Sequence, residues 1–220
     1  AGEGVVSAYL SEYVDRDAKR LNPMAGLIIT LVLVVAFFSL RAALIPNLIV
    51  AGTVAGTLGA MVLAGAEFYV ITNGLIVCMI GIAVADSIHI FSEYYEVMAG
   101  DPALSQTEAI ATAMAGIWRP VTLTTLTTAA GFLALYATND MPPLKFFGLF
   151  GAFAVILAGL LTLFVTPSLL SLFRARPSPR FRRHESSLPS RGLASGLGSL
   201  SLRYPKTILL TAAVVPGWAL

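Results

Sequence analysis

Five long apolar runs, separated by short polar connections, dominate this chain. They lie at residues 24–40, 44–63, 69–91, 121–137 and 146–173. A helix of roughly 17–25 residues crosses the hydrocarbon core of a bilayer, and lipid offers backbone groups no partner outside the helix itself. With 57% hydrophobic and 12% charged residues, the chain has too little polar surface to coat a water-soluble globule. The sequence therefore predicts an all-α integral membrane protein with five complete transmembrane helices.

Charged and small polar residues divide the chain into four regions. Residues 1–22 carry acidic and basic side chains around apolar positions at helical spacing, and we expect them to end an extracytoplasmic domain. The transmembrane domain is residues 23–173, with Asn22-Pro23 as the cap and first turn of its first helix. Residues 174–206 are basic and rich in Ser, Gly and Pro, which is typical of a flexible linker. Residues 207–220 begin a sixth transmembrane helix, so we expect the chain to be part of a longer protein.

A further helix is expected between the third and fourth runs. Gly100-Asp101-Pro102 should end the preceding helix in water, and Ser105 followed by Glu108 is a capping-box signature for a new helix. Apolar residues then recur along one side as far as Trp118. This pattern predicts a cytoplasmic helix in the membrane interface, with the fourth span starting at Arg119-Pro120.

Lys and Arg residues indicate which helix ends face the cytoplasm. Most of them lie on the side of Arg41, Arg119 and residues 174–206, whereas Lys145 and a few N-terminal basic residues offset by nearby acids lie on the other side. The positive-inside rule therefore makes the linker cytoplasmic, in a multi-pass protein of the cell (inner or plasma) membrane. Anionic lipid or nucleic acid could bind such a linker, but orientation and solvation explain its charge, so no nucleic-acid partner is expected.

Asp86 places a carboxylate in the last third of the third run, within the stretch Gly81–Ile90. Ionisable side chains are expensive in hydrocarbon, so they normally face a bundle interior or a water path and mark a functional site. Asp86 is therefore the main candidate functional residue of the chain. The alternative is a carboxylate at the cytoplasmic mouth of the bundle, where water would solvate it.

Threonine hydroxyls and one histidine are candidates to assist Asp86. Thr124 and Thr125 lie about as far from the cytoplasmic end of their helix as Asp86 does from the end of its own, at about 1.5 Å per residue. Thr124 and Thr128 share a face that could solvate a carboxylate or hold a file of water. The alternative is ordinary helix packing, with hydroxyls bonded to their own backbone. His89 shares a face with Asp86 and could pass protons, or it is a packed or interfacial histidine.

Glycines lie at intervals in the second, third and fourth runs. Gly52 and Gly56 lie along one side of the second run, Gly81 in the third and Gly131 in the fourth. Small residues let helix backbones approach closely. We expect these four glycines to pack helices rather than to bind a ligand.

The sequence lacks the residues that metal sites, nucleotide-binding loops and hydrolytic sites require. His89 and His184 are the only histidines and Cys78 is the only cysteine, so no metal site is expected. Cys78 lies in an apolar run and is expected to be a small buried side chain. No glycine-rich phosphate loop is present, and no Ser–His or paired-Asp arrangement is spaced for hydrolysis. We therefore expect no cofactor and no enzyme activity.

A combination of motifs resembles one transporter superfamily. The motifs are Leu44-Ile45-Pro46, Gly81–Ile90 with its Asp-Ser-Ile-His, Arg119-Pro120 leading into Thr124–Phe132, Phe147-Gly148, and Pro167–Leu170. In this order, over about residues 20 to 173, they resemble the first transmembrane half of a resistance-nodulation-division (RND) exporter. The similar branch is the MMPL and Patched-like one, whose membrane unit is also called the sterol-sensing domain.

The resemblance implies a protein of two such halves, each with a large extracytoplasmic domain after its first helix. This chain would hold helices two to six of the first half, the linker and the start of helix seven. It also implies that Asp86 is the residue that takes up protons in each transport cycle. Many relatives carry Asp-Asp or Asp-Tyr where this chain has Ala85-Asp86, so one carboxylate stands here instead of a pair.

The expected function is export of hydrophobic or lipid-like substrates, driven by the proton-motive force. The alternative is a sterol- or lipid-sensing membrane domain that transports nothing, and protein-export machinery uses the same fold. Expected partners are the lipid bilayer, the second half of the same polypeptide, the hydrophobic substrate and, as a candidate, a further copy of the protein.

Overall fold

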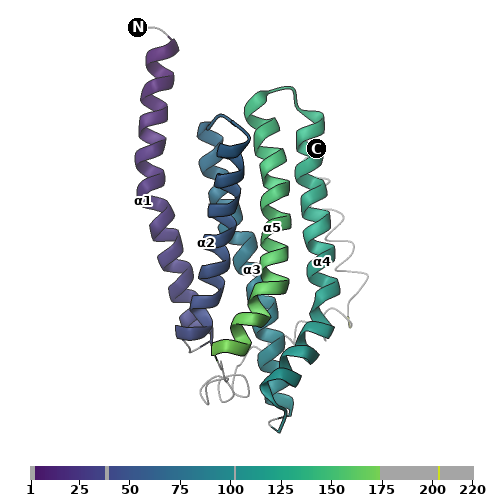
Figure 1. Ribbon diagram of the computed structural model, residues 1–220. Coiled ribbons are helices and arrows are strands. Elements are labelled where there is room, and N and C mark those ends of the chain that lie inside the picture. Colours follow the sequence, from purple (N-terminus) through teal and green to yellow (C-terminus); the bar gives the residue numbers. More distant parts are fainter. Residues whose placement is uncertain (1–2, 38–39, 102, 174–202, 204–220) are drawn as a thin grey trace. The chain divides into compact units, whose positions relative to one another are not determined.

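Five helices make up the first of two units of the chain, Ala1–Ser178. The computed structural model describes residues 3–37, 40–101, 103–173 and 203. The helices are α1 (Glu3–Phe37), α2 (Leu40–Leu63), α3 (Val70–Gly100), α4 (Gln106–Thr138) and α5 (Pro142–Phe173). Successive helices run in opposite directions (Figure 1), and the described residues contain no strand. The predicted all-helical class is confirmed.

Four of these helices are long and apolar enough to cross a membrane. The spans are Ala43–Leu63 in α2, Ile71–Gly100 in α3, Gln106–Thr138 in α4 and Pro142–Leu172 in α5. The crossing expected at 24–40 stays a prediction, although the exposed side chains of Leu27 and Leu31 in α1 suit contact with lipid. The linker at 174–206 and the helix expected from 207 to 220 lie outside the described residues, except for Arg203.

Helix boundaries predicted at two prolines are wrong. α1 runs without a break through Pro23, and α4 runs through Pro120. A proline inside a helix removes one backbone hydrogen bond, but membrane helices tolerate it because side chains and small backbone adjustments satisfy the freed carbonyl. The expected interfacial helix is therefore the first part of α4. In Figure 1 this lower part of α4 is inclined to the rest of the helix, as a proline kink would produce.

Gly65 sets the turn between α2 and α3. Its φ of 63° lies in the left-handed region, which glycine adopts easily because it has no Cβ. The Gly65 N–H donates to the Val62 carbonyl at 3.1 Å, and the Ala66 N–H donates to the Met61 carbonyl at 2.9 Å. This pair of bonds is the Schellman arrangement that ends many helices. Ala66 then packs with Met61 in one buried cluster, which fixes the direction of the chain as it leaves α2.

Polar contacts hold the hairpin between α3 and α4. α3 ends at Gly100, and the predicted capping box is present, with Ser105 and Glu108 each accepting a hydrogen bond from the other's backbone N–H. The Gln106 side chain donates to the Leu170 carbonyl of α5 at 2.5 Å. The last four carbonyls of a helix have no partner within it. Gln106 therefore satisfies one of them and ties the hairpin to the end of α5.

α5 packs against α2, α3 and α4 and lies between them (Figure 1). Three buried clusters join it to these neighbours. The first includes Met61, Met79 and Ala154; the second is Ile49, Ala83 and Ala158; and the third is Ala129, Ala152 and Val155. Because α5 contributes to each cluster, it sets the register of the other three helices along the bundle.

Two glycines of α5 allow a close approach to α4. A Cβ at Gly148 would lie 2.6 Å from the backbone nitrogen of Tyr136 and 2.7 Å from the carbonyl oxygen of Phe132. A Cβ at Gly151 would overlap the ring of Phe132. Such positions accept only glycine without movement of a helix. The contact is the small-residue packing that lets membrane helices meet closely.

A hydrogen bond between side chains joins α1 to α2. The Thr30 hydroxyl lies 2.7 Å from the Gly26 carbonyl of its own helix and 3.1 Å from Oδ1 of Asn47, and donates to both. The Asn47 amide in turn donates to the Ala43 carbonyl at 2.8 Å. All three bonds are partly buried, so water competes for them less than it would at an open surface.

Replacing Gly148 with alanine should push α4 and α5 apart. The new methyl group would meet backbone atoms, which cannot rotate away, and overpacking of this kind costs about 1–3 kcal/mol. Thermal unfolding of the purified protein in detergent should show a lower midpoint for Gly148→Ala. Gly59→Ala is the matched control, because nothing lies within 4 Å of a Cβ at Gly59. An equal loss of stability in both variants would contradict this packing.

Thr30 and Asn47 should be energetically coupled. Hydrogen bonds between membrane helices contribute about 0.6 kcal/mol on average in double-mutant cycles. We expect a coupling free energy of that order from unfolding of Thr30→Val, Asn47→Leu and the double variant. Strictly additive effects of the two substitutions would show that this bond does not hold α1 to α2.

Candidate functional site

Asp86 is buried inside the bundle. Its side chain lies in the membrane-spanning part of α3 and is only 8% exposed, and Ala83 and Ser87 beside it are fully buried. The carboxyl group has no hydrogen bond or ion pair with any described residue. Burying a charge without a partner is very unfavourable. Asp86 must therefore be neutral, be hydrated, or meet a partner that lies outside the described residues.

The contacts of neighbouring residues show which helix Asp86 faces. Ile82, one turn earlier, packs against a buried cluster formed by Ala129 of α4 with Ala152 and Val155 of α5. Glu93, seven residues later, lies beside α4 as well, because a Cβ at Gly116 would be 3.1 Å from its Oε1 atom. Residues four and seven apart share a helix face. Asp86 therefore lies on the side of α3 turned toward α4, between these two contacts.

The same two contacts place Thr124 and Thr125 at the level of Asp86. α3 and α4 run in opposite directions. On α3, Asp86 lies between Ile82 and Glu93. On α4, the two threonines lie between Ala129 and Gly116, the residues at the corresponding levels. These contacts put Asp86 and the two threonines at a similar depth, and the role of the threonines in assisting Asp86 stays a prediction. No hydrogen bond joins Asp86 to either threonine in the described part of the chain.

The threonine hydroxyls of α4 donate to their own helix. Thr125 donates to the Val121 carbonyl at 2.8 Å, and Thr124 donates to the Pro120 and Val121 carbonyls at 3.1 and 2.9 Å. Thr128 has no hydrogen-bond partner among the described residues. A hydroxyl that already donates its proton can still accept a hydrogen bond. Thr124 and Thr125 therefore offer acceptors, which suit a protonated carboxyl group better than a carboxylate, whereas the Thr128 hydroxyl can also donate.

His89 is exposed on α3 and has no hydrogen bond or ion pair within the described ranges. Three residues separate it from Asp86, so the two side chains leave the helix on related sides. The structure does not bring it into contact with the threonines of α4. Its role as a relay stays a prediction.

The four glycines expected to pack helices have different surroundings. A Cβ at Gly52 would lie 3.2 Å from the Leu161 side chain of α5, and one at Gly56 would lie 2.6 Å from Leu157. Nothing described lies within 4 Å of a Cβ at Gly81 or Gly131. The first two therefore face α5, and a packing role for the other two stays a prediction.

Gly159 is a site residue that sequence reasoning missed. A Cβ there would lie 2.7 Å from Oγ1 and 2.8 Å from Cγ2 of Thr125. Gly159 thus leaves the space in which Thr125 sits between α4 and α5. The signal was the recurrence of small residues along α5, at Gly148, Gly151 and Gly159, within a run that was read only as an apolar span.

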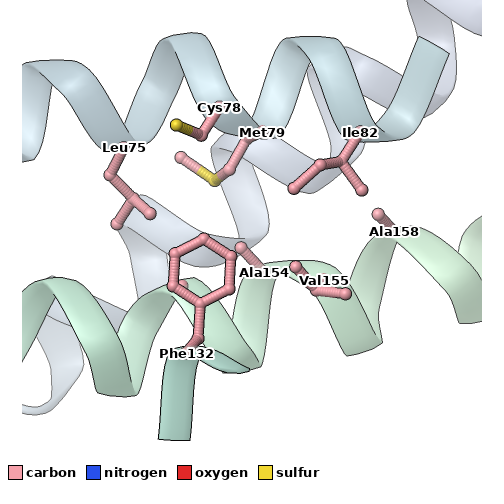
Figure 2. Close-up of a pocket in the computed structure, with 9 residues that line it drawn as sticks. Leu75, Cys78, Met79, Ile82, Phe132, Ala154, Val155 and Ala158 are labelled. Carbon is pink, nitrogen blue, oxygen red and sulfur yellow. The ribbon is translucent and has the colours of Figure 1, made fainter. Parts of the chain in front are cut away.

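A narrow apolar crevice lies between α3, α4 and α5, on the far side of Asp86 from the α3–α4 hairpin. Figure 2 shows the ring of Phe132 beside Met79 and Ile82 of α3, with Val155 of α5 nearby. Every lining side chain is apolar or the thiol of Cys78, and the space does not admit a water molecule. Cys78 was expected to be buried, but its side chain is exposed. This part of the interface is dry.

Comparison with known proteins identifies the family. The family model described as MMPL matches residues 1–208, which is nearly the whole chain and includes every helix described above. No curated protein matches the chain. The family match agrees with the motifs along α2 to α5 and with a multi-pass helical membrane protein. This chain belongs to the MMPL family.

Proposed function

We propose that this chain is half of the membrane domain of a secondary exporter, driven by the proton-motive force, that moves hydrophobic or lipid-like molecules. One observation carries the proposal. In an MMPL-family chain, Asp86 is a carboxyl group 8% exposed in a membrane-spanning helix, without a hydrogen bond or ion pair to any described residue. Ionisable groups of this kind mark proton relays and ion paths in transporters.

Proton uptake at Asp86 would change which conformation is stable. The charged carboxylate needs water or hydrogen-bond donors, whereas the neutral carboxyl group fits an apolar bundle. Each form therefore favours a different packing of α3 against its neighbours, and a proton gradient shifts the population between them. Export follows if only one packing opens the substrate path to the far side of the membrane.

Exposed apolar faces of the bundle support the proposed partners. Leu123, Leu126 and Leu133 of α4 are each more than 40% exposed, and so are Leu27 and Leu31 of α1. In the membrane these faces meet lipid, the second half of the same polypeptide or another copy of the protein. We place the protein in the cell (inner or plasma) membrane, with residues 174–206 in the cytoplasm and without a cofactor or enzyme activity.

Proton flux in proteoliposomes tests the proposal. The complete protein is reconstituted into lipids extracted from its own membrane, so that lipid-like substrates are present, and flux is followed with a pH-sensitive dye under an imposed pH gradient. Asp86→Asn keeps the size of the side chain but cannot lose a proton, so it should abolish flux. Glu96→Gln is the matched control, because Glu96 is an exposed carboxylate near the end of the same helix, and should leave flux unchanged.

Two results would contradict the exporter. Unchanged flux in a folded and inserted Asp86→Asn variant would show that Asp86 has no role in proton transport. Absence of flux in every variant, together with saturable binding of sterol or lipid by the wild-type protein, would favour the sensing domain. The dry crevice in Figure 2 means that such a ligand would have to separate the helices or bind elsewhere.

A further inference from the structure

Two threonines of α5 have buried hydroxyls without partners. Thr162 and Thr166 are fully buried, and the Oγ1 atom of each has no hydrogen-bond partner in the described part of the chain. Helical Ser and Thr usually donate to the carbonyl one turn earlier, as Thr53, Ser87 and Ser168 do here. Thr162 and Thr166 of α5 depart from this pattern.

The packing of α5 places the first of these hydroxyls at the level of Asp86 along the bundle. Ala158 packs with Ala83 of α3, and α3 and α5 run in the same direction. One turn beyond this contact, Thr162 follows Ala158 on α5, while Asp86 and Ser87 follow Ala83 on α3. Thr162 is therefore at the level of Asp86, and Thr166 lies one turn closer to the helix ends at Gly100 and Phe173.

Pro167 leaves a further acceptor at the same place. It has no N–H, so the Leu163 carbonyl lacks the donor that a regular helix would supply. In membrane helices such carbonyls are satisfied by side chains or by ordered water. About one turn of α5 therefore carries two hydroxyls, of Thr162 and Thr166, and the carbonyl of Leu163.

Water is the ligand that suits this arrangement. Buried water molecules typically form about three hydrogen bonds, each to a polar group that would otherwise lack a partner. Hydroxyls can both donate and accept, so they can join one water molecule to the next. Apolar lining would hold no water, but here the Thr162 and Thr166 hydroxyls offer polar atoms that have no partner among the described residues.

We propose that Thr162 and Thr166 hold a short file of water molecules that connects Asp86 to the end of the bundle formed by the α3–α4 hairpin and the end of α5. By the positive-inside rule this end is cytoplasmic. The role of the file in transport rests on the proposed function, because Asp86 is taken as the group that carries the proton. The presence of the water does not depend on that function.

The file ends at the level of Asp86. Beyond it, Ile49, Ala83 and Ala158 form a buried apolar cluster, and the crevice in Figure 2 is dry. The O–H bond of protonated Asp86 breaks, its proton passes to the nearest water, and an equivalent proton leaves the far end of the file, with the carboxylate left behind. In this conformation Asp86 exchanges protons with the cytoplasm only, as the release step of a proton-driven exporter requires.

Accessibility of introduced thiols tests whether the water is present. In the complete protein with Cys78→Ala, Thr162→Cys and Thr166→Cys are exposed to Ag⁺ in membrane vesicles and then alkylated after denaturation. We expect Ag⁺ to protect both thiols, since a small aqueous cation can follow a water file. Ala158→Cys, one turn deeper on the same face, is the matched control and should remain unprotected. Protection of none of the three, or of all three equally, would overturn the proposal.

Proton flux tests whether the file is used. Thr162→Val and Thr166→Val preserve shape but remove the hydroxyls and should slow flux several-fold, whereas Thr162→Ser should restore it. Thr127→Val is the control, because the Thr127 hydroxyl is exposed and donates to its own helix. If both valine variants show normal flux while Asp86→Asn shows none, the proposed water path is wrong but the proposed exporter function is not contradicted. If Asp86→Asn keeps its flux, the exporter fails, and Ag⁺ protection alone decides whether the water file exists.

Discussion

A carboxyl group inside an apolar helix bundle must find hydrogen-bond donors, water or a proton. Asp86 accepts no hydrogen bond from a described residue, and the Thr124 and Thr125 hydroxyls at its level on α4 already donate to backbone carbonyls. The rest of the site follows from this constraint. Polar groups near Asp86 can assist it only through donors or acceptors that are not already hydrogen-bonded. The apolar clusters determine which parts of the interface exclude water.

The close packing of α5 determines which polar groups lie free near Asp86 and where water is excluded. Gly148 brings α5 close to the backbone of α4, and Gly151 and Gly159 leave space for the side chains of Phe132 and Thr125. One turn beyond the Ala83–Ala158 contact, the same helix changes from apolar residues to threonines. On one side of Asp86 the interface is apolar, and on the other the unpartnered Thr162 and Thr166 hydroxyls occur along with fully buried apolar side chains such as Phe91. The proposed water file would let Asp86 exchange protons with this second side only.

Much of this arrangement could be read from the sequence, because membrane helices are recognised by length and hydropathy. Asp86 stood out as a charge within an apolar run, and its depth matched that of Thr124 and Thr125 once the helices were known to alternate. The prolines were misread, since Pro23 and Pro120 lie inside continuous helices whose surroundings satisfy the freed carbonyls. The glycines and threonines of α5 were missed because an apolar run shows no period that reveals which side faces a neighbour. Only the packing of α5 against α3 and α4 shows that Thr162 and Thr166 are buried without partners.

The most direct test of this account is infrared difference spectroscopy of the complete protein in lipid as a pH gradient is imposed. The carbonyl stretch of a protonated carboxyl group reports uptake and release of a proton at a single residue. The account predicts a carboxyl band that changes with the gradient, is absent in Asp86→Asn and remains in Glu96→Gln. A gradient-dependent band that persists in Asp86→Asn would show that another group carries the proton, and would contradict the central role given to Asp86.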